Sequence, residues 1–281
     1  MIIECANHIR RILQLLCFAA ICVRPCYSQS SAQADTESAR LMPNLANGWS
    51  QWAIDAAEGA GNWCCFDAMA TQPKTCNLDS PRLNFGSVSD GSNTSTRPLH
   101  TSTMHIYAKM AQGVLQRLRV FGADCPVSAE TPIAALGKIA TSSSLAWLNA
   151  ASVSTAMKEA QILPALAMHT GAAPILFSLA KRDAAAGIRR QSWFWLSQIN
   201  ASDLEREAML ALRVDPPART ESNAIVFAVS QLQAPRAGAA LIAIVEDTKL
   251  AIKVRKEALF WLGQLEGEQG LNYLDRVLGA D

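Results

Sequence analysis

Four cysteines gather in one stretch of the chain, at Cys64, Cys65, Cys76 and Cys125. Thiol groups can bind a metal, carry out redox chemistry or form structural disulfides, and His100 and His105 lie near them in sequence. The C-x-x-C spacing that is typical of zinc sites and of redox pairs is absent from this stretch. We therefore predict two disulfides, as expected for an even number of cysteines in an exported chain.

The sequence leaves the pairing of these cysteines open. A bond between the neighbours Cys64 and Cys65 is disfavoured because it would close a strained ring. One remaining arrangement joins Cys64 to Cys76 and Cys65 to Cys125. The other joins Cys64 to Cys125 and Cys65 to Cys76.

Side chains suited to acid–base or nucleophilic catalysis are few. The sequence has no G-x-S-x-G or H-E-x-x-H motif, no phosphate-binding glycine loop and no EF-hand loop. We place His100 in a loop, His105 on the polar face of a strand and His169 at the end of a helix, where a cation would interact well with the helix dipole. We therefore predict that the protein is not an enzyme and uses no metal or cofactor.

Two basic pairs are the candidate partner-binding residues: Arg189 with Arg190, and Arg255 with Lys256. They could line a groove that receives acidic groups. The alternative is a structural ladder of ion pairs, in which Arg189 lies near Asp183 and Arg255 lies near Asp247. The ladder is the favoured interpretation, and the basic pairs remain the first residues to test for binding.

Three tryptophans, Trp49, Trp52 and Trp63, crowd the start of the cysteine-rich stretch. If exposed, they would form an aromatic platform for a sugar or a peptide. If buried, they would fill the core of a small disulfide-stapled domain that has few aliphatic residues. We favour the core.

A sequence repeat positions the basic pairs. Residues 188–199, 221–232 and 254–265 align without a gap at a period of 33 residues. Apolar residues at i, i+4, i+7, i+8 and i+11 predict an amphipathic helix in each copy, and a second helix recurs at the same period. Fixed-period repetition predicts helix pairs that bury their apolar faces against their neighbours, with capping copies near the C-terminus.

Two further residue types fall in register in the three copies. Phe194, Phe227 and Phe260 are equivalent, and so are Gln198, Gln231 and Gln264. We expect the phenylalanines to pack against the neighbouring copy, or to form an apolar binding strip if they are exposed. The glutamines would stack as a hydrogen-bonded column or face a ligand.

The third copy resembles the short HEAT-like repeats that also occur in phycobilin-lyase-type proteins. Val254 with Arg255, Ala258 in mid-helix, and Leu262 with Gly263 at the helix end carry this resemblance, with a leucine-rich second helix behind them. It covers residues 160–281 well and residues 128–160 loosely. The resemblance implies an α-solenoid of HEAT-like αα-hairpins over residues 128–281, clearest over 171–281, and says almost nothing about chemistry.

Residues 46–127 do not follow the repeat. Met104 and Ile106 alternate with His105 and Tyr107, which is typical of a strand with one buried face. This pattern and the glycine-containing turn after it predict a β-hairpin over residues 104–121. With Trp63 beside Cys64 and Cys65, then Cys76 and Asp124-Cys125, this part resembles the N-terminal module of exported bacterial proteins that carry HEAT-like repeats. The expected fold class is mainly α, with a small disulfide-bonded, β-containing module ahead of the α-solenoid.

The N-terminus predicts export. Basic residues at 8–11, an apolar run at 12–23 and an A-x-A site at 32–34 are typical of a signal peptide over 1–34, which a flexible leader over 35–45 follows. The apolar run is too short to span a membrane, so no integral span is expected after cleavage. The 25 basic and 24 acidic side chains nearly balance, which argues against a nucleic-acid partner.

These features predict an exported, periplasmic or secreted, non-enzymatic scaffold or regulatory adaptor at the cell envelope. A protein partner of unknown identity would bind on the solenoid surface, because a solenoid offers a long rigid surface. The alternative is small-molecule or glycan binding, or lyase-type activity, in a cleft between the N-terminal module and the first repeats.

Overall fold

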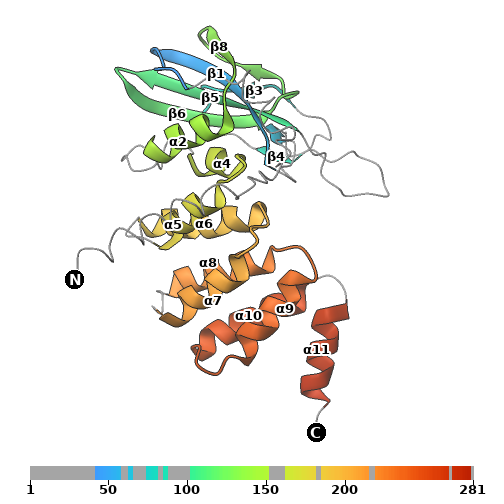
Figure 1. Cartoon of the computed structure of the whole chain (residues 1–281). Coiled ribbons are helices and arrows are strands. Elements are labelled where there is room, and N and C mark those ends of the chain that lie inside the picture. The colour runs from blue at the N-terminus through green and yellow to red at the C-terminus, as the bar shows by residue number, and fades with distance from the viewer. Residues whose placement is uncertain are drawn as a thin grey trace, which may run out of the picture. The chain divides into compact units, whose positions relative to one another are not determined.

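The computed structural model describes residues 42–57, 63–65, 74–81, 85–87, 102–151, 162–181, 185–214, 219–265 and 268–279. The predicted signal segment and His100 lie outside the described residues. Within them, a small β-sheet comes first and nine helices follow it in the chain (Figure 1). The mainly helical class and the β-containing, disulfide-bonded N-terminal part are thereby confirmed.

Four strands form the main sheet, in the order β6-β5-β1-β8. They are β1 (Gly48–Asp55), β5 (Thr103–Ala111), β6 (Val114–Gly122) and β8 (Ile133–Lys138). β5 and β6 are antiparallel over the residues where the alternation predicted a hairpin. Their turn residues, Gln112 and Gly113, have positive φ angles of 52° and 74°, which a two-residue hairpin turn requires.

Strand β8 lies in a segment that the repeat resemblance assigned to the solenoid. It pairs parallel with β1, from Trp49 opposite Ile133 onward. The first described helix, α2 (Thr141–Ala151), begins only after this strand. β8 alternates weakly and is mostly exposed, so its strand conformation comes from pairing with the edge of β1, which a sequence period does not report.

Both faces of the sheet are covered. Trp52, Met104 and Ile106 are fully buried and share one core with the helices. On the opposite face, Trp49 and Tyr107 pack with the four cysteines in a second apolar cluster. The prediction of a strand with one buried face was therefore wrong for Tyr107, which is 5% exposed, because the disulfide-bonded segment covers the face that alternation assigned to solvent.

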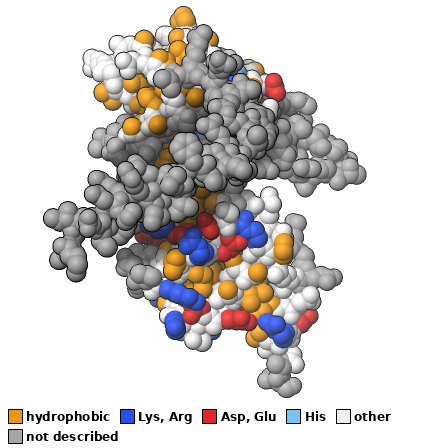
Figure 2. Space-filling model, in the orientation of Figure 1, with side chains coloured by type: hydrophobic (Ala, Val, Ile, Leu, Met, Phe, Trp, Pro, Cys, Tyr) orange, Lys and Arg blue, Asp and Glu red, His pale blue; other side chains and the backbone are white. Residues whose placement is uncertain are grey.

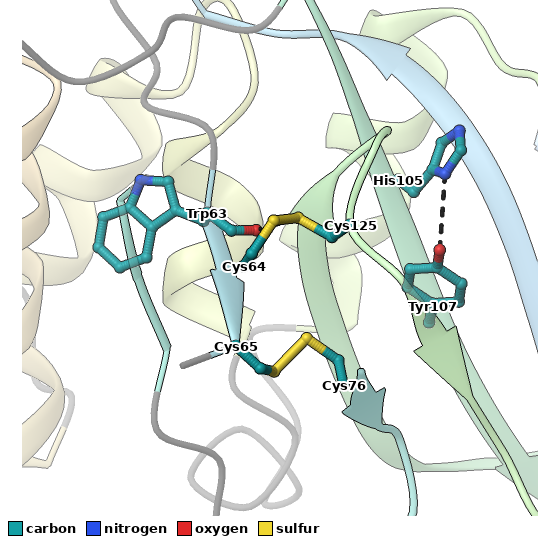
Figure 3. Close-up of a disulfide and its surroundings, with 7 residues drawn as sticks. All are labelled: Trp63, Cys64, Cys65, Cys76, His105, Tyr107 and Cys125. Carbon is teal, nitrogen blue, oxygen red and sulfur yellow. Dashed lines mark hydrogen bonds between the residues drawn. A yellow bond between two sulfur atoms is a disulfide. The ribbon is translucent and has the colours of Figure 1, made fainter. Parts of the chain in front are cut away.

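Two disulfides hold this covering segment, of which the structure describes residues 63–65 and 74–81 (Figure 3). Cys64 is bonded to Cys125 and Cys65 to Cys76, with Cα–Cα distances of 5.4 and 5.3 Å. The structure thus has the second of the two arrangements that the sequence left open. Four short strands accompany the bonds: β2 (Trp63–Cys65) pairs with β4 (Phe85–Ser87), and β3 (Cys76–Asn77) pairs with β7 (Val127–Ser128).

Asp79 fixes the covering segment to the sheet. Its carboxylate accepts hydrogen bonds from Trp49 Nε1 at 3.1 Å, from Lys109 Nζ at 2.6 Å and from the Glu130 backbone N–H at 2.8 Å. Burial disfavours the ionised carboxylate, but these donors outweigh burial and lower the pKa of Asp79 to about 2. Asp79 is therefore a charged anchor between β1, β5 and the segment that precedes β8.

The helices recur at the sequence period. α6 (Ala186–Gln198), α8 (Arg219–Ser230) and α10 (Ile252–Gln264) are the first helices of three pairs, and α7 (Leu204–Val214), α9 (Arg236–Glu246) and α11 (Glu268–Leu278) are their second helices. Two further helices, α4 (Ile162–Ala167) and α5 (Ala173–Lys181), precede them. α8 lies against both α6 and α10, so the three first helices contact one another in succession (Figure 1).

A line of buried polar groups joins the sheet to the helices. Trp52 Nε1 donates to the hydroxyl of Ser144 on α2 at 2.8 Å, and that hydroxyl donates to Nε2 of His169 at 2.8 Å. His169 Nδ1 donates in turn to the Ala165 carbonyl at 2.7 Å. Ser144 and His169 are 0% and 1% exposed. Every polar atom in this line has a partner, which is the condition for burying such groups at low cost.

His169 thus satisfies a carbonyl in the last turn of α4, but as a neutral imidazole and not as the expected cation. Burial lowers its pKa from 6.5 to about 4, against the opposing hydrogen bond to Ala165. A buried cation here would interrupt the hydrogen bond that Ser144 donates, because a protonated imidazole has no acceptor nitrogen.

We predict that the Cys64–Cys125 disulfide stabilises the fold more than the Cys65–Cys76 disulfide. Their sequence separations are 61 and 11 residues, so chain entropy gives contributions of about 4 and about 3 kcal/mol. Urea unfolding of Cys64→Ala/Cys125→Ala and of Cys65→Ala/Cys76→Ala, each with the other disulfide intact, measures the two losses. Equal losses, or the reverse order, would contradict this entropic account.

We also predict that acid destabilises the fold through His169. Between pH 6.5 and about 4 the unfolded chain binds a proton that the folded protein does not. The contribution of His169 is complete above pH 6.5, and the free energy of unfolding falls by about 3 kcal/mol as the pH drops to 4. Urea unfolding at a series of pH values measures this loss.

The variant His169→Gln isolates that contribution. It should be less stable than the wild type at pH 7 and should lose less stability between pH 6.5 and 4. The comparison variant is His105→Gln. Burial lowers the pKa of His105 as well, but His105 is only half-buried, so its replacement should reduce the pH dependence less than His169→Gln does. If His169→Gln kept the full pH dependence, other groups would be responsible for it.

Candidate partner-binding surface

The structure places the four candidate basic residues at the starts of α6 and α10. Arg189, Arg190 and Arg255 are half-buried, and Lys256 is exposed. α8 lies between the two helices and carries Ser222 at the position equivalent to Arg189 and Arg255. The two pairs are therefore not brought together into one continuous basic site.

Arg189 is bound within the protein. Its Nε lies 2.7 Å and one terminal nitrogen 2.9 Å from the two carboxylate oxygens of Glu221 on α8. The Arg189 and Glu221 side chains are 25% and 12% exposed, and such two-bond pairs are among the stronger ion pairs. The ladder interpretation named Asp183 as partner, which lies outside the described residues.

Arg255 makes a different contact from the one expected. Its Nε donates to the carbonyl of Val245 in the last turn of α9 at 2.7 Å. The expected partner, Asp247, instead accepts hydrogen bonds from Arg213 at 2.5 Å and from the Lys249 backbone N–H at 3.0 Å. The prediction of an Arg255–Asp247 pair was wrong because Arg213 from the preceding helix pair occupies that carboxylate.

Other ion pairs also join successive helix pairs. Arg236 on α9 donates two hydrogen bonds of 2.6 Å to Glu205 on α7, and the Arg236 bond lowers the pKa of the Glu205 carboxyl. Lys181 on α5 pairs with Glu207 on α7. These charged side chains serve contacts within the protein, so ligand binding through them would break internal pairs.

An aromatic row runs from the disulfide-bonded segment to the last helix pair, through Trp63, Trp195, Phe194, Phe227, Trp261 and Phe260. The Phe194 and Phe227 rings stack across α6 and α8, with centroids 6.4 Å apart and planes 6° apart. Phe227 contacts Trp261 of α10 at 5.0 Å. Two of the in-register phenylalanines thus pack against the next helix pair, whereas Phe260 is 56% exposed.

Exposed apolar side chains concentrate on the last helix pair. Of the seven large exposed apolar side chains in the described chain, five are on α10 and α11. These five are Ile252, Leu259, Phe260, Leu271 and Val277, with exposed fractions of 59, 37, 56, 62 and 55%. Figure 2 shows hydrophobic side chains among charged ones over the helical part of the molecule. We call these five residues the terminal surface.

Basic side chains border the apolar residues of α10. Lys253 and Lys256 are exposed, and at 100° per residue they share one face of the helix with Ile252, Leu259 and Phe260. The repeat predicted capping copies near the C-terminus, and capping repeats need a polar outer face. The outer face of the last described helix pair is mixed, with five exposed apolar side chains among charged ones (Figure 2).

The sequence contained a signal for the terminal surface. Leu259 is equivalent to Trp193 and Val226, which are 1% and 0% exposed. A polar residue at this position would have indicated a capping copy, so the retained leucine indicated a face that still needs cover. The candidates chosen by charge, Arg189 with Arg190 and Arg255 with Lys256, do not include this position.

The aromatic and histidine candidates of the N-terminal part have structural places. Trp49 and Trp52 are 2% and 0% exposed, as the core interpretation expects, and Trp63 packs on Trp195. The Tyr107 hydroxyl and Nδ1 of the half-buried His105 share a hydrogen bond of 3.5 Å (Figure 3). Burial lowers the pKa of His105 and raises that of Tyr107 to about 12. None of these side chains forms an exposed platform for a sugar.

The in-register glutamines lie on the surface. Gln198, Gln231 and Gln264 are all exposed. Gln231 donates to the hydroxyl of its neighbour Ser230 at 3.2 Å. Their exposure leaves them accessible to solvent or to a ligand on the first helices.

The part of the chain that the structure describes contains no group of three or more His, Cys, Asp or Glu side chains arranged to hold a metal ion. None of its helices combines the length and the apolar character needed to cross a membrane. No protein-family model matches the sequence, and no curated protein matches it either. The resemblance to HEAT-like repeats therefore depends on the residues of the repeats themselves.

We predict that the Arg189–Glu221 pair stabilises the fold. A double-mutant cycle with Arg189→Ala and Glu221→Ala should give a coupling free energy on the order of 1 to 2 kcal/mol, because both side chains are largely buried and doubly bonded. The control is the Lys138–Asp55 pair, whose side chains are 52% and 61% exposed. Its coupling should stay below about 0.5 kcal/mol, and a similar value for Arg189–Glu221 would mean that this pair contributes little.

Proposed function

We propose that the protein is an exported, non-enzymatic scaffold or regulatory adaptor whose helix pairs form a short α-solenoid of HEAT-like repeats and bind a protein partner. Support for the solenoid comes from the recurrence of the helices and from the successive contacts of α6, α8 and α10. Each pair in such an array contacts only its neighbours, which leaves an extended surface for binding.

The observation that carries the binding proposal is the terminal surface. Exposed apolar side chains that gather on adjacent helices are typical of sites where another protein binds. Phe260 lies at the end of the aromatic row and supplies a large ring of the kind that dominates binding energies. We therefore place the centre of the site on α10 and α11, with Lys256 and Arg255 at its margin.

The other basic pair, Arg189 with Arg190, is less suited to binding a partner. Arg189 is engaged with Glu221, so a charge reversal at Arg189 would test folding more than binding. Arg190 is half-buried and remains a secondary candidate for contact with the partner.

Export is proposed from two features of the chain. The predicted signal segment precedes the first described residues, and the two disulfides are of the kind that form in oxidising compartments such as the periplasm or the extracellular space. Stable disulfides are rare in reducing compartments.

The alternative, a small-molecule, glycan or lyase site between the N-terminal part and the first helices, receives no support from that junction. Trp52 contacts Trp147 of α2 at 5.7 Å between ring centroids, and Trp63 contacts Trp195 of α6 at 5.5 Å. These rings, with the buried line from Trp52 to His169, belong to one packed core.

The test is capture of partners from an envelope extract by the immobilised, disulfide-bonded protein. We expect a protein that is retained by the wild type and lost from Phe260→Asp/Leu271→Asp, because two charges on the terminal surface oppose an apolar contact. The captured protein is then identified by mass spectrometry and purified. Mixed with the wild type, it should sediment as a complex with it.

The matched control is Val114→Asp/Leu210→Asp, which changes two apolar side chains that are 53% and 45% exposed elsewhere. It should retain the partner. Equal retention by all three proteins would remove the terminal surface from the proposal. Retention of nothing by well-folded protein at high loading would contradict the scaffold function.

A further inference from the structure

We propose that α10 binds an acidic amphipathic helix of the partner in the way that α6 binds α8. The partner helix would carry a carboxylate and, six residues later, an aromatic side chain. This inference rests on the proposed function, since it names the chemistry of the partner that the helical surface binds.

The first reason is that α10 repeats the residue types with which α6 binds α8. At equivalent positions 66 residues apart, the two helices share five residue types: Arg189 and Arg255, Phe194 and Phe260, Trp195 and Trp261, Leu196 and Leu262, Gln198 and Gln264. Leu196 and Leu262 are both 0% exposed, so the two helices are also rotated alike with respect to the core. What binds one outer face should therefore fit the other.

The second reason is that the structure contains the bound form of this surface. On α6, Arg189 holds the Glu221 carboxylate by two hydrogen bonds of 2.7 and 2.9 Å, and Phe194 stacks on Phe227. Glu221 and Phe227 are six residues apart on α8. An ion pair at one end and a ring stack at the other thus define both the register and the direction of the docked helix.

The third reason is exposure. Trp193 and Ser197 on α6 are 1% and 3% exposed, and their equivalents on α8, Val226 and Ser230, are 0% and 6% exposed. On α10 the equivalent Leu259 is 37% exposed and Gly263 is also exposed. α6 and α8 are each followed by another first helix that packs on them, and within the described residues α10 is not. Phe177 of α5 covers part of Trp193 as well, but Leu259, Phe260 and Gly263 together show that the equivalent face of α10 is open.

Charge selects the occupant. Lys253, Arg255 and Lys256 lie in the first turns of α10, where the helix dipole adds a positive potential. The Nε of Arg255 is bound to the Val245 carbonyl, and a guanidinium has five N–H donors, which is more than that bond uses. Glu257, which accepts a hydrogen bond from Trp261 at 3.0 Å, is the one acidic residue of α10 against these three basic ones. The start of α10 therefore has a net positive charge, which favours a carboxylate on the incoming helix.

A second copy of this chain fits less well. Two copies that met through α10 would bring Lys253 and Lys256 of each copy toward the same cations of the other, and like charges across an interface oppose association. The occupant is therefore a helix of a different protein, with an acidic and an aromatic residue six positions apart.

The probe is the chain's own α8 made as a separate peptide. A peptide of residues 219–232, capped at both ends, stapled into a helix on its outer face and labelled with a fluorophore, is titrated with the full oxidised protein. Fluorescence anisotropy should report saturable binding. Phe260→Ala and Arg255→Gln in the protein should each weaken binding at least ten-fold, and so should peptides with Glu221→Gln or Phe227→Ala.

Two controls keep the result interpretable. Val114→Ala, at an exposed apolar residue on β6, should bind the peptide like the wild type, and near-ultraviolet circular dichroism should show that Phe260→Ala keeps its fold, since its side chain is 56% exposed. Absence of saturable binding would overturn the inference. So would binding that Phe260→Ala leaves unchanged, because the peptide would then be docking elsewhere.

Three further outcomes distinguish a failure of this inference from a failure of the proposed scaffold function. If the protein alone forms a dimer that Phe260→Ala abolishes, a second copy is the occupant and the acidic helix is the wrong one. If the peptide fails to bind while an envelope protein is still captured through the terminal surface, the scaffold function stands and the inference falls. Peptide binding without any captured protein would support helix docking on α10 and contradict the scaffold function.

Discussion

Each helix pair leaves one apolar face that only a neighbouring element can bury, and the arrangement of the chain follows from this constraint. At one end the sheet supplies the neighbour, because α4 lies against β6 and Trp63 packs on Trp195. In the middle, α8 covers α6 and α10 covers α8. The N-terminal part is therefore not a separate module but the element that closes the first end of the helical array.

Where the sheet meets the helices, buried polar side chains bond to one another within the apolar core. Trp52, Ser144 and His169 do so in a line of hydrogen bonds. Since each group is useful only when its partner is in place, this line fixes the position of the sheet on the helices more specifically than apolar packing could. On the other face of the sheet, Asp79 fixes the disulfide-bonded segment in the same way. The disulfides then hold the covering segment against the outer face of the sheet.

Local patterns predicted the elements, and contacts distant in sequence decided the rest. The period of the apolar residues placed α6, α8 and α10, and the alternation around Met104 placed the hairpin, because each pattern comes from residues within one element or one hairpin. The cover over Tyr107, the pairing of β8 with β1 and the choice of Glu221 as partner of Arg189 depend on segments far away in the chain. For the proposed site, charge predicted both basic pairs, and the proposal keeps Arg255 and Lys256 on α10. The exposure of Phe260 could not be predicted from the sequence, because it depends on how the helices pack.

Helices with neighbours on both sides and helices with a neighbour on one side do not resist unfolding equally. Among the described elements, α6 is held by the elements before it and by α8, whereas α10 and α11 are held from one side. Fraying should therefore begin at the α10–α11 end and advance toward the sheet, where the disulfides stop it. A partner that docks on α10 would act as a neighbour on its open face, and its binding free energy would add to the local stability of α10 and α11. Occupancy and resistance to proteolysis would then rise together in the same molecule.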